Sequence, residues 1–216
     1  PTMLIDIARI PDLAGIKEKD GKIQIGAATT HHAVATSSLL TDTCPALAET
    51  AATIGDPQVR NRGTIGGSLA HADPAADYPA ILVALDAEIH IKGKGGWRAV
   101  KANDFFQGLF TVDLQPDEII AGVQLKPAKA AAYAKLHQRA SHFAIVGVGA
   151  SLDVSGGNIT AARIGLTGAT THAVRLANVE AALTGKPLSD ATIASAAAVA
   201  GDGLDDLNAD IHASAD

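Results

Sequence analysis

The segment TIGGSLAHADPAAD, residues 64–77, decides how the rest of the chain is interpreted. Its paired glycines, Gly66 and Gly67, follow a short strand-like stretch and open a run of small residues that can begin a helix. Glycine lets the backbone come close to a ligand, and a helix N-terminus presents N–H groups to a phosphate. The segment has no lysine and no G-x-G-x-x-G spacing, so it is neither a Walker loop nor a dinucleotide fingerprint. Two interpretations stay open: a phosphate-binding turn, or a plain turn between two elements.

Composition narrows the class of protein. The 216 residues suit one large domain or two small ones, and 47% hydrophobic with 3% aromatic residues predicts a core of aliphatic side chains. A net charge of −6 argues against a nucleic acid or an anionic membrane as partner. The single cysteine, Cys44, excludes an intrachain disulfide and an iron–sulfur site built from this chain alone. No apolar run reaches membrane-spanning length and no signal peptide is visible, so we expect a cytoplasmic protein.

Periodicity and turn residues predict the elements of the first half. We expect strands over residues 4–7, 15–19, 22–25, 88–91, 97–100 and 119–125, with a hairpin turn at Asp20 and Gly21. Helices are expected over residues 31–37, 43–54 and 74–85, with a single helical turn over 103–106. Thr29 or Thr30 is suited to cap the first helix. Residues 56–63 are expected to form a polar loop that leads into the glycine pair.

The pattern changes after residue 127. Residues 127–132 have no apolar period and are the best candidate linker, which divides the chain into domains 1–127 and 130–216. Beyond it we expect three antiparallel strands over residues 133–137, 144–154 and 159–166, then helices over 176–183 and 191–200. Strands followed by helices predict an α+β fold for this part. The chain opens at Pro1 without an initiator methionine, so we expect a piece of a longer polypeptide.

The residues themselves favour binding over hydrolysis. No G-x-S-x-G elbow is present, and although His71, Asp73 and Asp77 could in principle hold a metal, the further ligands that would complete such a site are not evident. We therefore predict no catalytic residue and no metal site. A phosphate-bearing ligand has support from the glycines and from the nearby Arg60 and Arg62, although both arginines can equally be solvent-facing loop residues. Asp77 could accept hydrogen bonds from a ribose or an adenine.

Several longer motifs carry a family resemblance. They are GAATT at residues 26–30, GDPQVRNRGTIGGSLA at 55–70, DPAAD at 73–77, RASHFAIV at 139–146 and DIHASA at 210–215. Together they resemble the flavin-binding medium subunit of molybdenum hydroxylases, above all of aerobic carbon monoxide dehydrogenases and more distantly of xanthine dehydrogenases. The resemblance extends over essentially the whole chain.

The resemblance implies an FAD-binding domain of the vanillyl-alcohol-oxidase type, followed by a small α+β C-terminal domain. It implies that Thr64–Ser68 holds the pyrophosphate, that Thr30 and Asp77 contact the flavin nucleotide, and that Phe143 lies near the isoalloxazine. The cofactor-binding residues expected on this ground are Thr30, Thr64, Ile65, Gly66, Gly67, Ser68, Asp73, Asp77 and Phe143. The family's first double-glycine segment, in an N-terminal subdomain, is absent from this sequence, so we expect weak FAD binding or none by these residues alone.

The same resemblance implies partners. An iron–sulfur small subunit would carry [2Fe-2S] clusters and a large subunit would carry molybdopterin, in a dimer of heterotrimers. The chain would pass electrons from a cluster through FAD to an external acceptor. Two alternatives stay open: a standalone flavin reductase of the cell-wall amino-sugar type, and a nucleotide-binding or scaffold module without cofactor. The substrate of the whole enzyme and the electron acceptor cannot be read from this sequence.

Overall fold

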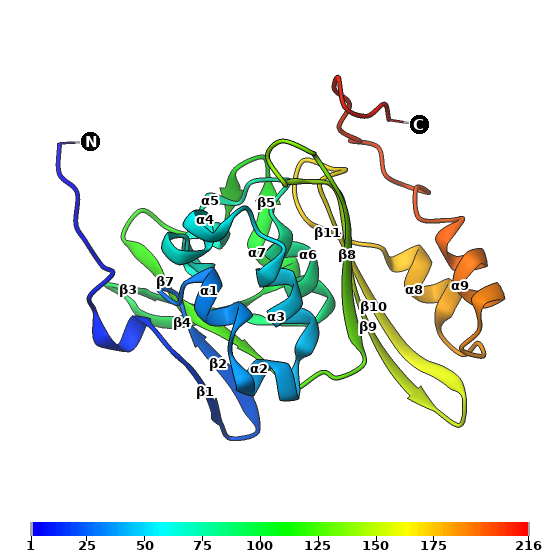
Figure 1. Cartoon of the computed structure of the whole chain (residues 1–216), viewed down its shortest axis with the longest axis horizontal. Helices are drawn as coiled ribbons and strands as arrows, with labels where there is room; N and C mark the ends of the chain where they lie inside the picture. Colours follow the sequence, from blue (N-terminus) through cyan, green and yellow to red (C-terminus); the bar gives the residue numbers. More distant parts are fainter. Residues whose placement is uncertain (1, 216) are drawn as a thin grey trace.

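The computed structural model describes residues 2–215, which form alternating layers of sheet and helix (Figure 1). The first sheet is antiparallel, with strand order β1-β2-β7-β3-β4. Its strands are β1 (Ile16–Lys19), β2 (Lys22–Gly26), β3 (Glu88–Gly93), β4 (Gly96–Lys101) and β7 (Glu118–Leu125). Alternate side chains such as Ile23 and Ile89 are fully buried beneath the helices, as expected of a sheet with one covered face.

Short helices cover that buried face. They are α1 (His31–Ala35), α2 (Ser38–Thr43), α3 (Pro45–Ala52), α4 (Pro57–Arg62), α5 (Ile65–His71), α6 (Asp77–Ala84) and α7 (Ala102–Phe105). A two-stranded ribbon of β5 (Phe106–Gly108) and β6 (Thr111–Val112) follows α7, and a 3₁₀ turn (Pro11–Leu13) precedes β1. Four of these helices are capped by a threonine, serine or aspartate side chain at the N-terminus.

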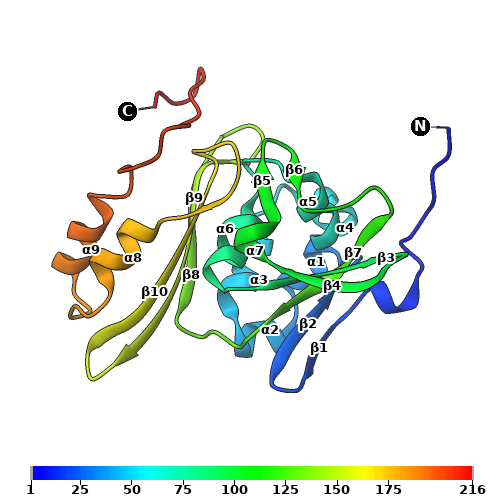
Figure 2. The ribbon, with the colours of Figure 1, turned by 180° about the vertical axis from the view of Figure 1, so that it is seen from behind.

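The second sheet is antiparallel, with order β11-β10-β9-β8. It consists of β8 (Ala131–His137), β9 (Ala144–Ser155), β10 (Asn158–Thr167) and β11 (Val174–Arg175), and it is followed by α8 (Ala177–Leu183) and α9 (Asp190–Ala197). Figure 2 shows α3 and α6 between the two sheets and α8 and α9 beyond the second. Separate apolar clusters fill the space on the two sides of this second sheet.

Helix α6 lies against both sheets, and all eight of its residues are buried. Glycines make its close approach to the second sheet possible. A Cβ at Gly149 of β9 would lie 2.7 Å from the Cα of Ile81, and a Cβ at Gly165 of β10 would overlap the Ala80 carbonyl oxygen. The backbone of α6 therefore rests directly on β9 and β10, so the two parts of the chain share one helix.

Several elements differ from the sequence-based expectation. Residues 4–7 form no strand, because no other strand among residues 2–215 pairs with them, and Leu4 is 86% exposed. The expected loop at 56–63 is helix α4, which Asp56 caps by accepting a hydrogen bond from the Val59 amide at 2.8 Å. The helix expected from residue 74 begins at Asp77, after a turn over 73–76.

The second sheet also differs from the expectation of three strands. Its fourth strand, β11, pairs only two residues with β10, too few for a periodicity to reveal. Strand β8 begins at Ala131, inside the expected linker over residues 127–132. The hairpin turn at Asp20 and Gly21 is confirmed, with φ of 53° and 69° as a type I′ turn requires.

Replacing Gly165 by alanine will lower the free energy of unfolding by about 2 kcal/mol, because the new methyl group overlaps the Ala80 carbonyl oxygen. The matched control is Gly95→Ala, in the turn between β3 and β4, where an added Cβ meets no atom within 4 Å. Urea denaturation of both variants and the wild type measures the difference. Equal stability of the two variants would contradict the close packing of α6 on the sheet.

Candidate functional site

Two helix N-termini lie side by side at the beginning of the quoted segment. Thr30 and Thr64 form an isolated antiparallel bridge, in which the His31 amide donates to the Gly63 carbonyl at 2.9 Å and the Ile65 amide donates to the Thr29 carbonyl at 3.0 Å. The hydroxyl oxygen of Thr30 caps α1, and that of Thr64 caps α5. The partial positive charges of the two helix ends are thereby brought together at one place.

The first four amides of α5 all donate hydrogen bonds within the chain. The amides of Ile65 and Gly66 donate to the carbonyls of Thr29 and Ala27, and the Ser68 amide donates to the Thr64 carbonyl. The Gly67 amide donates to the Thr64 hydroxyl oxygen at 3.0 Å. The structure thus differs from a nest of free amides. A phosphate here would meet the exposed Gly67 backbone, whose amide bonds only to a rotatable hydroxyl.

The two glycines of the pair have different surroundings. Gly66 is buried, and a Cβ there would lie 2.5 Å from the Cβ of Ala27. Gly67 is exposed, and a Cβ there would meet only the Thr64 hydroxyl, at 3.0 Å. Gly66 is therefore required by packing, whereas Gly67 leaves an open surface. The hydroxyl of Ser68 makes no hydrogen bond within residues 2–215, so it is available beside that surface.

A second group of expected residues lies beyond the other end of α5. At 1.5 Å per residue this seven-residue helix separates the two groups by about 10 Å. Thr167 of β10 anchors the turn over residues 73–76. Its hydroxyl lies within hydrogen-bond distance of two carbonyl oxygens of the turn, at 2.7 Å from that of Pro74 and 2.8 Å from that of Ala76. The turn is also bonded to the first residue of β9, directly after the loop over residues 138–143, because the Ala144 amide donates to the Ala75 carbonyl at 3.2 Å.

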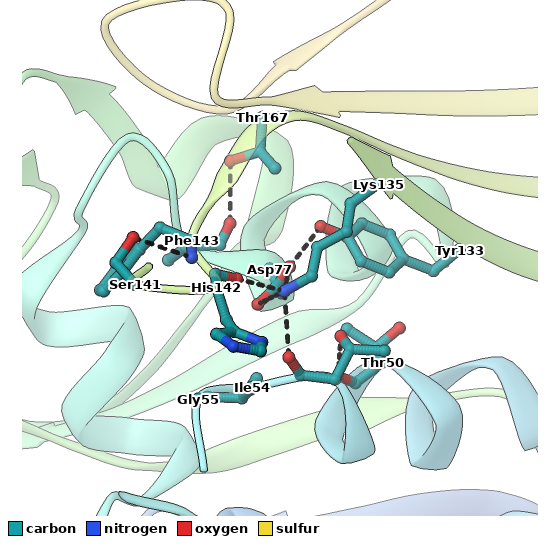
Figure 3. Close-up of polar contacts among 12 residues, drawn as sticks. Thr50, Ile54, Gly55, Asp77, Tyr133, Lys135, Ser141, His142, Phe143 and Thr167 are labelled. Carbon is teal, nitrogen blue, oxygen red and sulfur yellow. Dashed lines mark hydrogen bonds and ion pairs between the residues drawn. The ribbon is translucent and has the colours of Figure 1, made fainter. Parts of the chain in front are cut away.

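Asp77 lies in a buried cluster at the start of α6 (Figure 3). Its carboxylate accepts a hydrogen bond from the Tyr133 hydroxyl at 2.6 Å and forms an ion pair with Lys135 at 3.0 Å. The Lys135 ammonium also donates to the carbonyls of Thr53 at 3.0 Å and His142 at 2.8 Å. We call these five residues the Lys135 cluster.

Burial dominates the electrostatics of this cluster. It raises the pKa of Asp77 above the ordinary range, although the hydrogen bond from Tyr133 and the charge of Lys135 act in the opposite direction. The pKa of Tyr133 is raised as well, by burial and by the neighbouring carboxylate. Both oxygens of Asp77 are already engaged. A nucleotide in direct contact with Asp77 would have to share these oxygens with Tyr133 and Lys135 or displace one of the two.

Strand alternation could have revealed Lys135 and Tyr133, which the sequence analysis missed. They stand two residues apart on β8, so they project from the same face of that strand. Their partners Thr53, Asp77 and His142 come from distant parts of the chain. Phe143, expected near the isoalloxazine, follows His142 in the same loop and is 47% exposed.

The two arginines near the glycine pair and the histidine and aspartate weighed as metal ligands have the following surroundings. Arg60 donates to the carbonyls of Ile54 and Gly55, at 2.9 and 3.1 Å, so it supports the chain after α3. Arg62 is exposed. His71 lies 4.0 Å from Asp73, but within residues 2–215 no group of three or more histidine, cysteine, aspartate or glutamate residues is arranged to hold a metal ion. No helix in that range is long and apolar enough to cross a membrane.

Comparison with known families assigns the chain. Residues 1–129 match the FAD binding domain in molybdopterin dehydrogenase, and residues 131–216 match the CO dehydrogenase flavoprotein C-terminal domain. The chain belongs to this flavoprotein family. The predicted family is thus confirmed, as are the class of FAD-binding medium subunit of molybdenum hydroxylases and a mixed α/β fold with these two domains.

Individual relatives agree with this assignment. The chain is 40% identical over 220 residues to the 6-hydroxypseudooxynicotine dehydrogenase complex subunit alpha of Paenarthrobacter nicotinovorans, covering 100% of this chain and 74% of that protein. It is 37% identical to the carbon monoxide dehydrogenase medium chain of Hydrogenophaga pseudoflava, over 91% of this chain and 70% of that one. A crystal structure of the carbon monoxide dehydrogenase of that organism superposes with a TM-score of 0.92 at 37% identity, covering 97% of this chain and 74% of the other. The structure of quinoline 2-oxidoreductase from Pseudomonas putida 86 superposes with a TM-score of 0.92 at 33% identity, covering 99% of this chain and 75% of the other.

The two glycines will respond differently to alanine. Gly66→Ala will lower the free energy of unfolding by about 2 kcal/mol, because its methyl group collides with Ala27. Gly67→Ala is the matched control and will change it by less than about 1 kcal/mol, because only the rotatable Thr64 hydroxyl lies near. Thermal or urea unfolding measures both. Similar losses in the two variants would show that Gly67 is not an open position.

His31 will make stability depend on pH. It is 5% exposed, its ring lies 3.2 Å from the Tyr78 hydroxyl, and burial lowers its pKa to about 4. The unfolded chain takes up a proton below about pH 6.5, whereas the folded chain does so only near pH 4. The contribution of the neutral ring to the free energy of unfolding is therefore present above pH 6.5. It falls by up to about 2 kcal/mol as the pH drops from 6.5 to 5. The control is His31→Gln, which cannot titrate. Parallel stability curves for the two proteins over this range would contradict the assignment.

Proposed function

We propose that the chain is the flavin-bearing electron-transfer subunit of a molybdenum hydroxylase, which passes electrons from an iron–sulfur cluster of a partner subunit to an external acceptor. The carrying observation is structural: α5 connects the Thr64–Ser68 surface to the turn at 73–76, and the Ala144 amide, directly after the loop at 138–143, donates to the Ala75 carbonyl of that turn. These are the segments that the family resemblance assigns to the cofactor. Bound FAD would supply the redox chemistry, and the protein would bind and orient it.

The residues present fit one side of such a cofactor. Thr64, Gly67 and Ser68 would hold the phosphate groups beside the two helix N-termini, with Thr30 completing the edge. Ile65 and Gly66 are buried and would hold that edge in place from behind.

The other expected contacts lie around the turn at 73–76. The Asp73 carboxylate accepts a hydrogen bond from the Ala75 amide at 2.9 Å and shapes the turn. Asp77 would contact the nucleotide by sharing its oxygens or displacing a bond, or support the site through Lys135 and Tyr133. The exposed ring of Phe143 would cover an aromatic face of the flavin.

The context of the subunit is inferred in the same way. We assign to its partners the iron–sulfur clusters and the molybdopterin, place the assembly in the cytoplasm as a dimer of heterotrimers, and divide this chain at residues 127–130. The FAD-binding part is proposed to be of the vanillyl-alcohol-oxidase type. The relatives named as a complex subunit and as a medium chain support a multi-subunit enzyme over a standalone flavin reductase. A scaffold without cofactor is the remaining alternative.

The function is tested by the flavin itself. The protein purified with its partner subunits will show flavin absorption bands and release about one FAD per chain, identified by chromatography. Absence of flavin from the assembled enzyme would refute the proposal and leave the scaffold. The 216-residue chain alone will hold FAD weakly, and stoichiometric FAD there would show that the residues of this chain suffice.

A charge at Gly67 tests the site. Gly67→Asp will weaken FAD binding by about tenfold or more, because a carboxylate placed at this open surface repels a phosphate. Gly95→Asp, in the exposed turn between β3 and β4, introduces the same charge away from the site. Titration of the deflavinated protein with FAD measures both dissociation constants. Equal affinities for the two variants would exclude Gly67 from the phosphate site.

A further inference from the structure

We infer that Lys135 is a positioning residue, which fixes the loop over residues 138–143 and the start of α6 relative to each other at the cofactor-facing end of the molecule. The inference rests on the proposed function for what the loop contacts. Its structural part, that one ammonium group holds the loop, can be tested without any cofactor.

The ammonium group of Lys135 has three protons, and three segments use them. Asp77 contributes the start of α6, the Thr53 carbonyl contributes the end of α3, and the His142 carbonyl contributes the loop. These acceptor oxygens lie 2.8–3.0 Å from the Lys135 nitrogen, and the lysine side chain is 7% exposed. An ammonium with all donors engaged in a buried place acts as a fixed junction, because any segment that leaves it exposes an unpaired charge.

The loop turns sharply at the residue that Lys135 holds. His142 has φ of 62°, in the left-handed region that few residues other than glycine adopt, although asparagine, aspartate and histidine do so more often than the rest. The Gln138 side chain closes the loop locally by accepting bonds from the Ala140 and Ser141 amides. These local bonds fix the loop's own shape. Only the Lys135 contact ties His142 to Asp77 and Thr53 in this group of bonds.

The position of Lys135 links this loop to the proposed site. Phe143 directly follows the carbonyl that Lys135 holds, and the chain then enters β9 through the Ala144 amide bond to Ala75. The Thr53 carbonyl precedes the stretch that leads through α4 to Thr64. Loosening Lys135 therefore displaces the residue expected at the isoalloxazine.

The first experiment measures the loop directly. Lys135→Met removes all three donors, and Lys129→Met, in the exposed segment before β8, is the matched control. Amide hydrogen exchange at Ala144, whose bond to the Ala75 carbonyl joins the end of the loop to the turn before α6, will be about tenfold faster in Lys135→Met than in the control or the wild type, as expected when a charge-assisted bond that holds the loop is lost. Unchanged exchange in a folded Lys135→Met protein would overturn the inference.

A second variant covers the case in which Lys135→Met does not fold because Asp77 is left buried without its partner. In the double variant that combines Asp77→Asn with Lys135→Met, neither charge remains. The side-chain oxygen introduced by Asp77→Asn can still accept the hydrogen bond from the Tyr133 hydroxyl. Faster exchange at Ala144 in this double variant supports the inference. Exchange as slow as in the wild type overturns it.

The cofactor readout separates this inference from the proposed function. In the assembled enzyme, Lys135→Met will shift the midpoint potential of the flavin and weaken FAD binding about tenfold, whereas Lys129→Met will change neither. Wild-type enzyme without FAD would refute the proposed function, and the exchange experiment would still decide the role of Lys135. Wild-type enzyme with FAD but an unshifted potential in Lys135→Met would refute the positioning role alone.

Discussion

The architecture depends on how closely helix α6 lies against the second sheet. An ordinary side chain at Gly149 or Gly165 would hold the sheet away from the helix backbone, and the Lys135 cluster would separate. Because α6 also packs in the first apolar cluster through Ile81 and Leu82, it fixes the distance between the two sheets. Asp77 at its first position then meets Tyr133 and Lys135 of β8. Steric fit between helix and glycine thus places the polar groups.

The polar cluster at this junction is costly to bury, which explains its complete pairing. Burial raises the pKa of the Asp77 carboxylate. The hydrogen bond from Tyr133 and the charge of Lys135 oppose this effect by stabilising the charged form. Buried ion pairs often contribute little net stability compared with apolar residues of the same size. The value of this one lies in geometry, because one ammonium group joins the end of α3, the start of α6 and the loop over residues 138–143.

Local signals in the sequence predicted local features well. The Asp20–Gly21 turn and the helix cap expected at Thr29 or Thr30 each depend on residues within a few positions, and both are present, with Thr30 as the cap. Helix α4 was missed because none of its residues is buried, so apolar periodicity had nothing to detect, although the Asp56–Pro57 start signal was there. The sequence located the family and the Thr64–Asp77 segment. It could not show that the amides of α5 are already bonded or that Lys135 meets Asp77, 58 positions away, because both depend on tertiary packing.

The sharing of α6 also bears on how such subunits can diversify. The chain can be divided near residue 130 by sequence, yet the helix that seats the second sheet lies well before that point. A hybrid of this chain and a relative joined there would take α6 from one parent and the strands that face it from the other. Such an exchange therefore has to keep residues as small as Gly149 and Gly165 against residues 77–84 of this chain. Variation is expected to be freer on α8 and α9, which lie on the outer side of that sheet (Figure 1).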